Sequence, residues 1–172
     1  ASGEYIALLD HDDMLNQTCL YEVVKLLNRE RAADIIYSNE DKLTMDGRRM
    51  NPELKPAWRE SLFLTYNYIN HVTVCRKEII DRIGGFRLGF EGSQDYDLLL
   101  RATELTDRIY HIPKFLYHWR MIPGSTAEVV DAKDYAFERS KKALRDAMER
   151  RGIKAIVRDG MQVGHFEVVY ED

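Results

Sequence analysis

Short apolar runs alternate along the chain with longer segments whose apolar residues recur every three or four positions. The short runs are typical of strands, and the periodic segments are typical of amphipathic helices. The expected strands cover residues 5–9, 33–38, 71–76, 108–112, 115–120 and 165–171. The expected helices cover residues 18–29, 57–66, 77–83, 94–106 and 133–150. Strands that alternate with helices in this way predict an α/β fold.

Turn-forming residues separate these elements. A polar stretch, residues 39–56, follows the second expected strand and contains a turn signal at Asp46-Gly47. Gly84-Gly85 is expected to end the helix before it. Pro113 and Lys114 are expected to divide the last apolar region before residue 120 into two strands.

The composition excludes several classes of protein. Of 172 residues, 45% are hydrophobic and 31% are charged, and the formal net charge is −4, so we expect no nucleic-acid partner. No apolar run approaches the ~20 residues of a membrane span. The two cysteines lack metal-site spacing, so we expect a cytoplasmic protein, with the inner face of a membrane as the alternative location. The chain has no initiator Met and enters a strand within four residues, so we expect it to be part of a longer protein.

Three carboxylates, Asp10, Asp12 and Asp13, follow the first expected strand. Carboxylates this close repel one another unless a cation offsets their charge. Ligands of open α/β sheets bind beyond the carboxyl ends of strands, and oxygen-rich positions suit Mg²⁺ or Mn²⁺ bound to substrate phosphates. An EF-hand is excluded because its fifth, sixth and twelfth positions would be Met, Leu and Tyr. A cap on the following helix explains one of the three residues, but not all.

Asp95 and Asp97 stand at the start of the helix that follows a glycine-rich loop. Both are suited to a helix N-terminus, and Asp97 can pair with Arg101 four residues later. The alternative is that one carboxylate faces a cleft as a general base.

His118 and Arg120 lie on one side of the strand 115–120, and Trp119 lies on the other. An imidazole can complete a metal site and a guanidinium suits a phosphate, whereas the alternative for a single strand histidine is a structural hydrogen bond. The other histidines lack acidic neighbours in the sequence and are interpreted as structural: His71, His111 and His165.

Four segments occur in the order ASGEYIALLDHDDML, IIYSNEDKL, GGFRLGFEGSQDYDLLLR and IPKFLYHWR. Together they resemble family 2 glycosyltransferases, and the resemblance covers residues 1–126. It implies the GT-A fold, a Rossmann-like mixed sheet flanked by helices. It also implies an inverting enzyme that moves a sugar from a nucleotide-diphospho-sugar to a hydroxyl of a saccharide or other acceptor, in cell-surface polysaccharide synthesis.

The resemblance also assigns the candidate residues of the donor side. In this family the acidic DXD segment holds a divalent cation, Mn²⁺ or Mg²⁺, that bridges the donor diphosphate. Asp12 would be the direct metal ligand and Asp10 would assist it. His118 matches a position that contacts metal or diphosphate, and Arg120 would join it at the diphosphate.

The base and the acceptor side are assigned in the same way. Asp95 would take the proton from the acceptor hydroxyl, although Gln94 stands where the family often has Glu. Gly85, Phe86 and Trp119 would lie toward the acceptor. Asp97 would lie on that side too, as the next candidate for the base.

The resemblance leads us to expect that the family's first, nucleoside-binding half precedes this sequence in the longer protein. We therefore expect residues 1–126 to be the C-terminal portion of one GT-A catalytic domain, with its metal, base and acceptor elements. Residues 127–172 resemble the helix–strand connector of proteins that carry two such domains in tandem. Without the missing half, we expect the isolated chain to be inactive.

Two other functions compete with this interpretation. Another metal-dependent phosphate enzyme, a nucleotidyltransferase or phosphohydrolase, would also use Asp10 and Asp12, but it leaves QDYDLLLR followed by LYHWR unexplained. A non-catalytic interaction module would use the acidic residues as helix caps and the helix 133–150 to bind a partner. That module predicts that Asp12→Ala and Asp95→Ala leave the activity of the longer protein intact.

Overall fold

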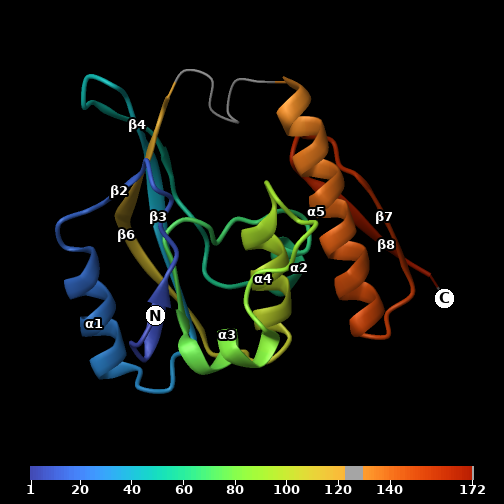
Figure 1. The fold of residues 1–172 in the computed structure, drawn as a ribbon, viewed down its shortest axis with the longest axis horizontal. Coiled ribbons are helices and arrows are strands. Elements are labelled where there is room, and N and C mark those ends of the chain that lie inside the picture. The colour runs from blue at the N-terminus through green and yellow to red at the C-terminus, as the bar shows by residue number, and fades with distance from the viewer. Residues whose placement is uncertain (123–129, 172) are drawn as a thin grey trace.

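A mixed six-stranded sheet forms the centre of the computed structural model, which describes residues 1–122 and 130–171 (Figure 1). Its strands are β1 (Tyr5–Ala7), β2 (Met14–Leu15), β3 (Ile35–Leu43), β4 (Arg49–Glu53), β5 (Thr73–Arg76) and β6 (Ile109–Arg120). The order is β1-β5-β3-β6-β2, and β4 pairs with β3. β3 and β6 run parallel, and the other pairs are antiparallel. The predicted α/β class is therefore confirmed.

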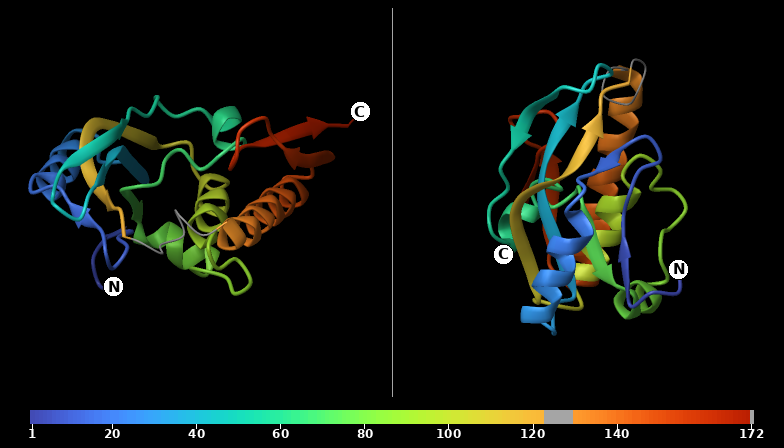
Figure 2. Two further views of the ribbon diagram at one scale, coloured as in Figure 1. Left: turned by 90° about the horizontal axis from the view of Figure 1, so that it is seen from above. Right: turned by 90° about the vertical axis from the view of Figure 1, so that its left-hand side faces the viewer.

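Five helices and a second, two-stranded sheet complete the described chain. The helices are α1 (Cys19–Arg29), α2 (Glu60–Phe63), α3 (Lys77–Ile83), α4 (Gln94–Thr103) and α5 (Val130–Arg150). β7 (Ala155–Asp159) and β8 (Phe166–Tyr170) form an antiparallel hairpin. Figures 1 and 2 show α1 at one end of the molecule and α5 with this hairpin at the other, with α4 between the sheet and α5. No helix in the described part of the chain has the length and apolar character needed to cross a membrane.

Two apolar clusters hold the elements together. They contain different residues of β3, because successive side chains of a strand point to opposite faces of the sheet. Ile36 belongs to the cluster that includes Val23 and Leu26 of α1. Ile35 and Tyr37 belong to a larger cluster that joins α4 to α5 and to the β7–β8 hairpin. The segment after residue 130 thus shares a core with the sheet.

The polar stretch 39–56 differs most from its expectation. β3 continues into it as far as Leu43, and Asn39, Glu40 and Asp41 are buried. Burying such groups requires partners, and each of them has one, as described below. The expected turn is confirmed, since Gly47 has a φ of 84° and donates its N–H to the Thr44 carbonyl.

Other elements also differ from the sequence expectation, and the strands β2, β4 and β7 were not expected. β1 is shorter than residues 5–9 and only partly buried, because within the described residues it pairs with β5 alone. β6 is one strand, not two, because Pro113 and Lys114 form an irregularity without register partners on β3. α2 covers only part of the helix expected over 57–66.

Candidate active site

A cavity of about 570 Å³ brings together residues that are far apart in the sequence. It lies where the chain leaves β1, between the start of α4 and the end of β6. Its walls are formed by Ala7, Leu8, Leu9, Asp10, Asn70, His71, Phe86, Gly92, Gln94, Asp95 and Trp119. Four predicted site residues therefore share one cavity, namely Asp10, Phe86, Asp95 and Trp119.

Asp95 reaches this cavity from the first turn of α4. Its Oδ2 atom accepts hydrogen bonds from Nδ2 of Asn67, at 3.2 Å, and from Nδ2 of Asn70. Burial raises the pKa of Asp95 above its usual value, although the charge of His71 and backbone N–H groups act in the opposite direction. A carboxylate with a raised pKa in a cavity is suited to accept a proton.

His71, which the sequence analysis interpreted as structural, lies at the centre of the site. Its Nε2 is 3.6 Å from Oδ2 of Asp10 and its Nδ1 is 3.5 Å from Oε2 of Glu40. Burial alone would lower the pKa of His71, but these two carboxylates raise it to about 9. The ring also stacks on Tyr117, with centroids 4.7 Å apart. The sequence carries no sign of these acidic neighbours, because they come from segments that are distant from His71 along the chain.

Glu40 and Lys55 both contact His71. Nζ of Lys55 lies 3.1 Å from Oε2 of Glu40 and donates a hydrogen bond to the His71 carbonyl at 2.7 Å. Burial would raise the pKa of Glu40, but His71 and Lys55 lower it to about 2. This buried pair fixes the cavity wall because each charge would be costly without its partner.

The acidic loop after β1 is held by the end of β6. Asp13 accepts hydrogen bonds from the Tyr117 hydroxyl at 2.5 Å and from the Arg120 backbone N–H at 2.8 Å, so it does not cap α1. Nε of Arg120 donates to the Asp12 carbonyl at 2.8 Å. The side chains of Asp10 and Asp12 are 58% and 29% exposed, which leaves both carboxylates accessible to a ligand.

These two carboxylates fit a divalent cation only if the ligand supplies the remaining oxygens. In the part of the chain that the structure describes, no three His, Cys, Asp or Glu side chains gather as a metal site. Mg²⁺ is commonly held by one or two carboxylates together with substrate phosphates. The exposed carboxylates of Asp10 and Asp12 are of the type that this pattern uses, and of the two only Asp10 lines the cavity.

His118 lies on the opposite side of β6 from Tyr117 and Trp119. Its Nδ1 is 2.6 Å from Oδ1 of Asp41, and its Nε2 is 3.4 Å from Nδ2 of Asn16. The structure therefore does not bring His118 together with Asp10 and Asp95 in the cavity.

Asp97 also points away from the cavity and is fully buried. It pairs with Arg87 and with Arg101, whose Nη2 lies 2.7 Å from its Oδ2, so the pair expected from the i,i+4 spacing is present. Arg101 also donates a hydrogen bond to the Gly85 carbonyl at 2.8 Å. Asp97 thereby fixes the loop that presents Phe86, which is 56% exposed at the cavity.

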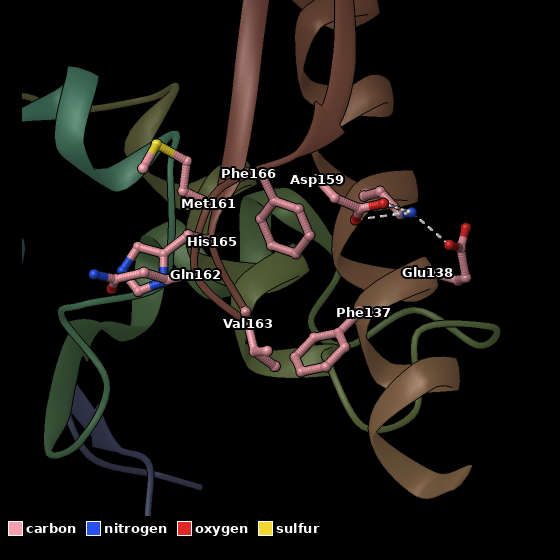
Figure 3. Close-up of a pocket in the computed structure, with 11 residues that line it drawn as sticks. Phe137, Glu138, Asp159, Met161, Gln162, Val163, His165 and Phe166 are labelled. Atoms are coloured by element: carbon pink, nitrogen blue, oxygen red, sulfur yellow. Dashed lines mark hydrogen bonds and ion pairs between the residues drawn. The ribbon is translucent and has the colours of Figure 1, made fainter. Parts of the chain in front are cut away.

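A second cavity, of about 490 Å³, lies between α5 and the loop of the β7–β8 hairpin (Figure 3). Its two carboxylates, Glu138 and Asp159, both pair with Nζ of Lys141, at 2.5 and 3.0 Å. No predicted site residue lines it. Of these two cavities, only the first is lined by predicted site residues.

Comparison with known proteins identifies the family. The sequence model described as "Glycosyl transferase family 2" matches residues 1–93, which is more than half of the chain. The chain belongs to glycosyl transferase family 2. The matched segment contains β1, the acidic loop, His71 and the glycine-rich loop, but it ends just before Asp95.

Two longer proteins resemble nearly the whole chain. The uncharacterized protein y4gI of Sinorhizobium fredii is 46% identical over 91% of this chain. The O-antigen biosynthesis protein RfbC of Myxococcus xanthus is 34% identical over 90% of it. The chain spans only 17% and 12% of the lengths of these relatives.

Solved structures of S. aureus TarS share the fold. TarS residues 1–349 in complex with UDP-GlcNAc match with a TM-score of 0.61 at 16% identity, over 83% of this chain and 42% of that one. The same TarS region without ligand gives a TM-score of 0.54 at 15% identity. The sheet and its flanking helices thus form the GT-A arrangement expected for the family.

Proposed function

We propose that this chain forms the metal, base and acceptor portion of an inverting glycosyltransferase. The observation that carries the proposal is that Asp10 and Asp95, which are distant in the sequence, line one cavity. The donor is a nucleotide-diphospho-sugar, a proposal supported by the UDP-GlcNAc complex of TarS. A role in cell-surface polysaccharide synthesis is supported by the name of RfbC.

In the proposed reaction Asp95 takes the proton of the acceptor hydroxyl. The acceptor oxygen then bonds to the anomeric carbon as the bond from that carbon to the diphosphate breaks, and the diphosphate leaves with the electron pair. A divalent cation held by Asp12 and Asp10 would offset the negative charge of that leaving group. Arg120, which lies beside the Asp12 carbonyl, is the proposed cationic contact of the diphosphate.

The acceptor is proposed to lie between Phe86 and Trp119, within reach of Asp95. Gly85 shapes this side through its positive φ of 71° and through its carbonyl contact with Arg101. Residues 1–126 are proposed as the catalytic portion and residues 127–172 as the connector. A metal contact by His118 stays a prediction, since its ring meets Asp41 and Asn16 here.

The test measures donor affinity and sugar transfer in the full-length protein. Asp95→Asn should lower the transfer rate about 10²–10⁴-fold while donor affinity stays unchanged, because the base meets the acceptor only. Asp12→Asn should lower both the donor affinity and the transfer rate, because the cation would bind the diphosphate in the ground state and in the transition state. Asp81→Asn, which removes an exposed carboxylate of α3, is the matched control.

Two outcomes would contradict the proposal. A wild-type transfer rate for Asp95→Asn would reject Asp95 as the base. Release of free phosphate without sugar transfer by the wild-type protein would favour a phosphohydrolase.

Metal binding can be tested on the chain itself. Paramagnetic relaxation should detect weak, saturable Mn²⁺ binding, because only two carboxylates contact the ion when no diphosphate is present. Asp12→Ala should reduce this binding, and Asp81→Ala should not. Equal binding by wild type and Asp12→Ala would reject the proposed site.

A further inference from the structure

Helix α5 lies outside the segment that the family model matches, yet it contacts the loop that leads to Asp95. We name residues 84–93 the glycine loop. Phe86 and Gly92, near its two ends, line the cavity, and Asp95 follows it after Gln94. Figure 1 shows α5 running alongside α4, whose first turn continues from this loop.

The glycine loop is poorly restrained by its own sequence. Its four glycines all adopt positive φ, from 71° at Gly85 to 89° at Gly89. Glycine has more backbone freedom than any other residue, so ordering such a loop is entropically costly. Contacts from outside the loop must therefore hold it in the conformation that faces the cavity.

Three polar contacts from α5 meet this requirement. Nη1 of Arg139 donates a hydrogen bond to the Gly89 carbonyl at 2.5 Å. The hydroxyls of Ser140 and Ser93 are 2.7 Å apart. Further along the helix, Oδ2 of Asp146 lies 3.0 Å from Nη2 of Arg87. The spacing of these residues places them on one side of α5.

Close packing adds to the polar contacts. A Cβ atom added to Gly92 would lie 2.6 Å from Oη of Tyr135 and 3.4 Å from Cβ of Ala136. Tyr135 therefore lies directly against the backbone of a residue that lines the cavity. Nζ of Lys142 lies 4.5 Å from the ring centroid of Phe90, within the range of a cation–π contact.

We propose that α5 belongs to the acceptor side of the site, with Tyr135 and Arg139 as positioning residues for the glycine loop. This inference rests on the proposed function, because it concerns the same transfer reaction. The contacts hold the glycine loop, and with it the residues Phe86 and Gly92 that line the cavity, in place beside Asp95. The donor side is independent of them, since Asp10, Asp12 and Arg120 belong to the acidic loop and β6.

The experiment compares two identical substitutions on one helix in the full-length protein. Arg139→Gln removes the contact with the glycine loop. Arg150→Gln removes the pair of Arg150 with Glu104, at 2.7 Å, which does not involve that loop. Arg139→Gln should raise the acceptor KM about tenfold, the effect of losing one charge-assisted hydrogen bond, and leave the donor KM unchanged. Arg150→Gln should leave both constants unchanged.

Tyr135 provides a second and independent variant. Tyr135→Ala should also raise the acceptor KM, whereas Tyr135→Phe keeps the ring and should restore the wild-type value. Hydrogen exchange in the full-length protein should be faster at residues 84–93 in Arg139→Gln and Tyr135→Ala, and unchanged at the 44–48 turn.

The failures of the two proposals are distinguishable. If Asp95→Asn abolishes transfer while Arg139→Gln and Tyr135→Ala keep the wild-type acceptor KM, the role of α5 is rejected and the proposed function stands. An equal rise in donor and acceptor KM would assign α5 a general structural role and also reject the inference. If Asp95→Asn transfers normally, both proposals fall.

Discussion

The first turn of α4 carries two aspartates with opposite surroundings. Asp95 faces the cavity, where two neutral amides bind it and the charge of His71 acts on it, and burial raises its pKa. Asp97 faces the core. Burial would raise its pKa as well, but the guanidinium groups of Arg87 and Arg101 lower it below the usual value. Two residues in a helix are about 200° apart around the axis, so one turn presents one carboxylate to each environment.

This difference separates the carboxylate that we propose as the base from one that is held in ion pairs. Asp97 is held by two permanent charges, so it stays ionised and fixes the position of the Gly85 carbonyl through Arg101. Asp95 has no guanidinium partner in the described structure, and burial raises its pKa above the usual value. Both aspartates belong to the first turn of one helix, but they face opposite sides of it, so their neighbours differ.

The largest effect on stability is expected at Asp97. Asp97→Asn leaves the buried Arg101 without its carboxylate, and losing one partner of a buried ion pair costs about 3 kcal/mol or more. Asp95→Asn should not lower the free energy of unfolding, because it removes a half-buried carboxylate that has no guanidinium partner in the described structure. Urea unfolding of both variants at neutral pH provides the measurement. A larger loss for Asp95→Asn than for Asp97→Asn would contradict the comparison.

A smaller effect is expected in the pH dependence of stability. The folded pKa of Asp97 lies below its usual 3.8, so its contribution is present above that value and is lost as the pH falls through the folded pKa. The stability gap between wild type and Asp97→Asn should stay constant from about pH 7 to pH 5 and narrow below about pH 4. Urea unfolding across this range tests the sign. A gap that widens in acid would show that the pKa is raised.

The two aspartates also show how far the sequence could be interpreted. The i,i+4 spacing predicted the Asp97–Arg101 ion pair. The order of the four motifs indicated Asp95 as the candidate base. His71 was missed because its partners, Asp10 and Glu40, lie on β1's exit loop and on β3, far away in the sequence. A histidine between a strand and a loop carries no local signal of such neighbours.

The fold, too, was predictable only where the sequence carries a local signal. Helices with regular apolar spacing, such as α1 and α3, were expected nearly to the residue. The C-terminal end of β3 was not expected, because the polar residues Asn39, Glu40 and Asp41 have the composition of a loop. They are buried because His111, Lys55 and Arg49 supply their partners. Those contacts form only when the sheet assembles, so periodicity could not reveal them.

The smallest predicted effect concerns the tuning of Asp95 itself. Nδ2 of Asn67 donates a hydrogen bond to Oδ2 of Asp95 at 3.2 Å, and this bond favours the ionised carboxylate. Asn67→Ala removes the donor, so the pKa of Asp95 should rise further. The other groups that act on this pKa stay in place, namely the charges of His71 and Asp10, the backbone N–H groups of Asp95 and Tyr96, and the side chain of Asn70. The base must be ionised to act, so the acid limb of the pH–rate profile should move to higher pH.

The transfer rate on the plateau should change little, because Asn67→Ala leaves the carboxylate itself intact. The measurement is the transfer rate of the full-length protein as a function of pH, with Asn28→Ala on the exposed side of α1 as the matched control. A shift to lower pH would mean that Asn67 does not stabilise the ionised form. An unchanged limb would mean that a group other than Asp95 limits the rate in acid. Either result would remove the distinction between the tuned carboxylate at position 95 and the permanently paired one at position 97.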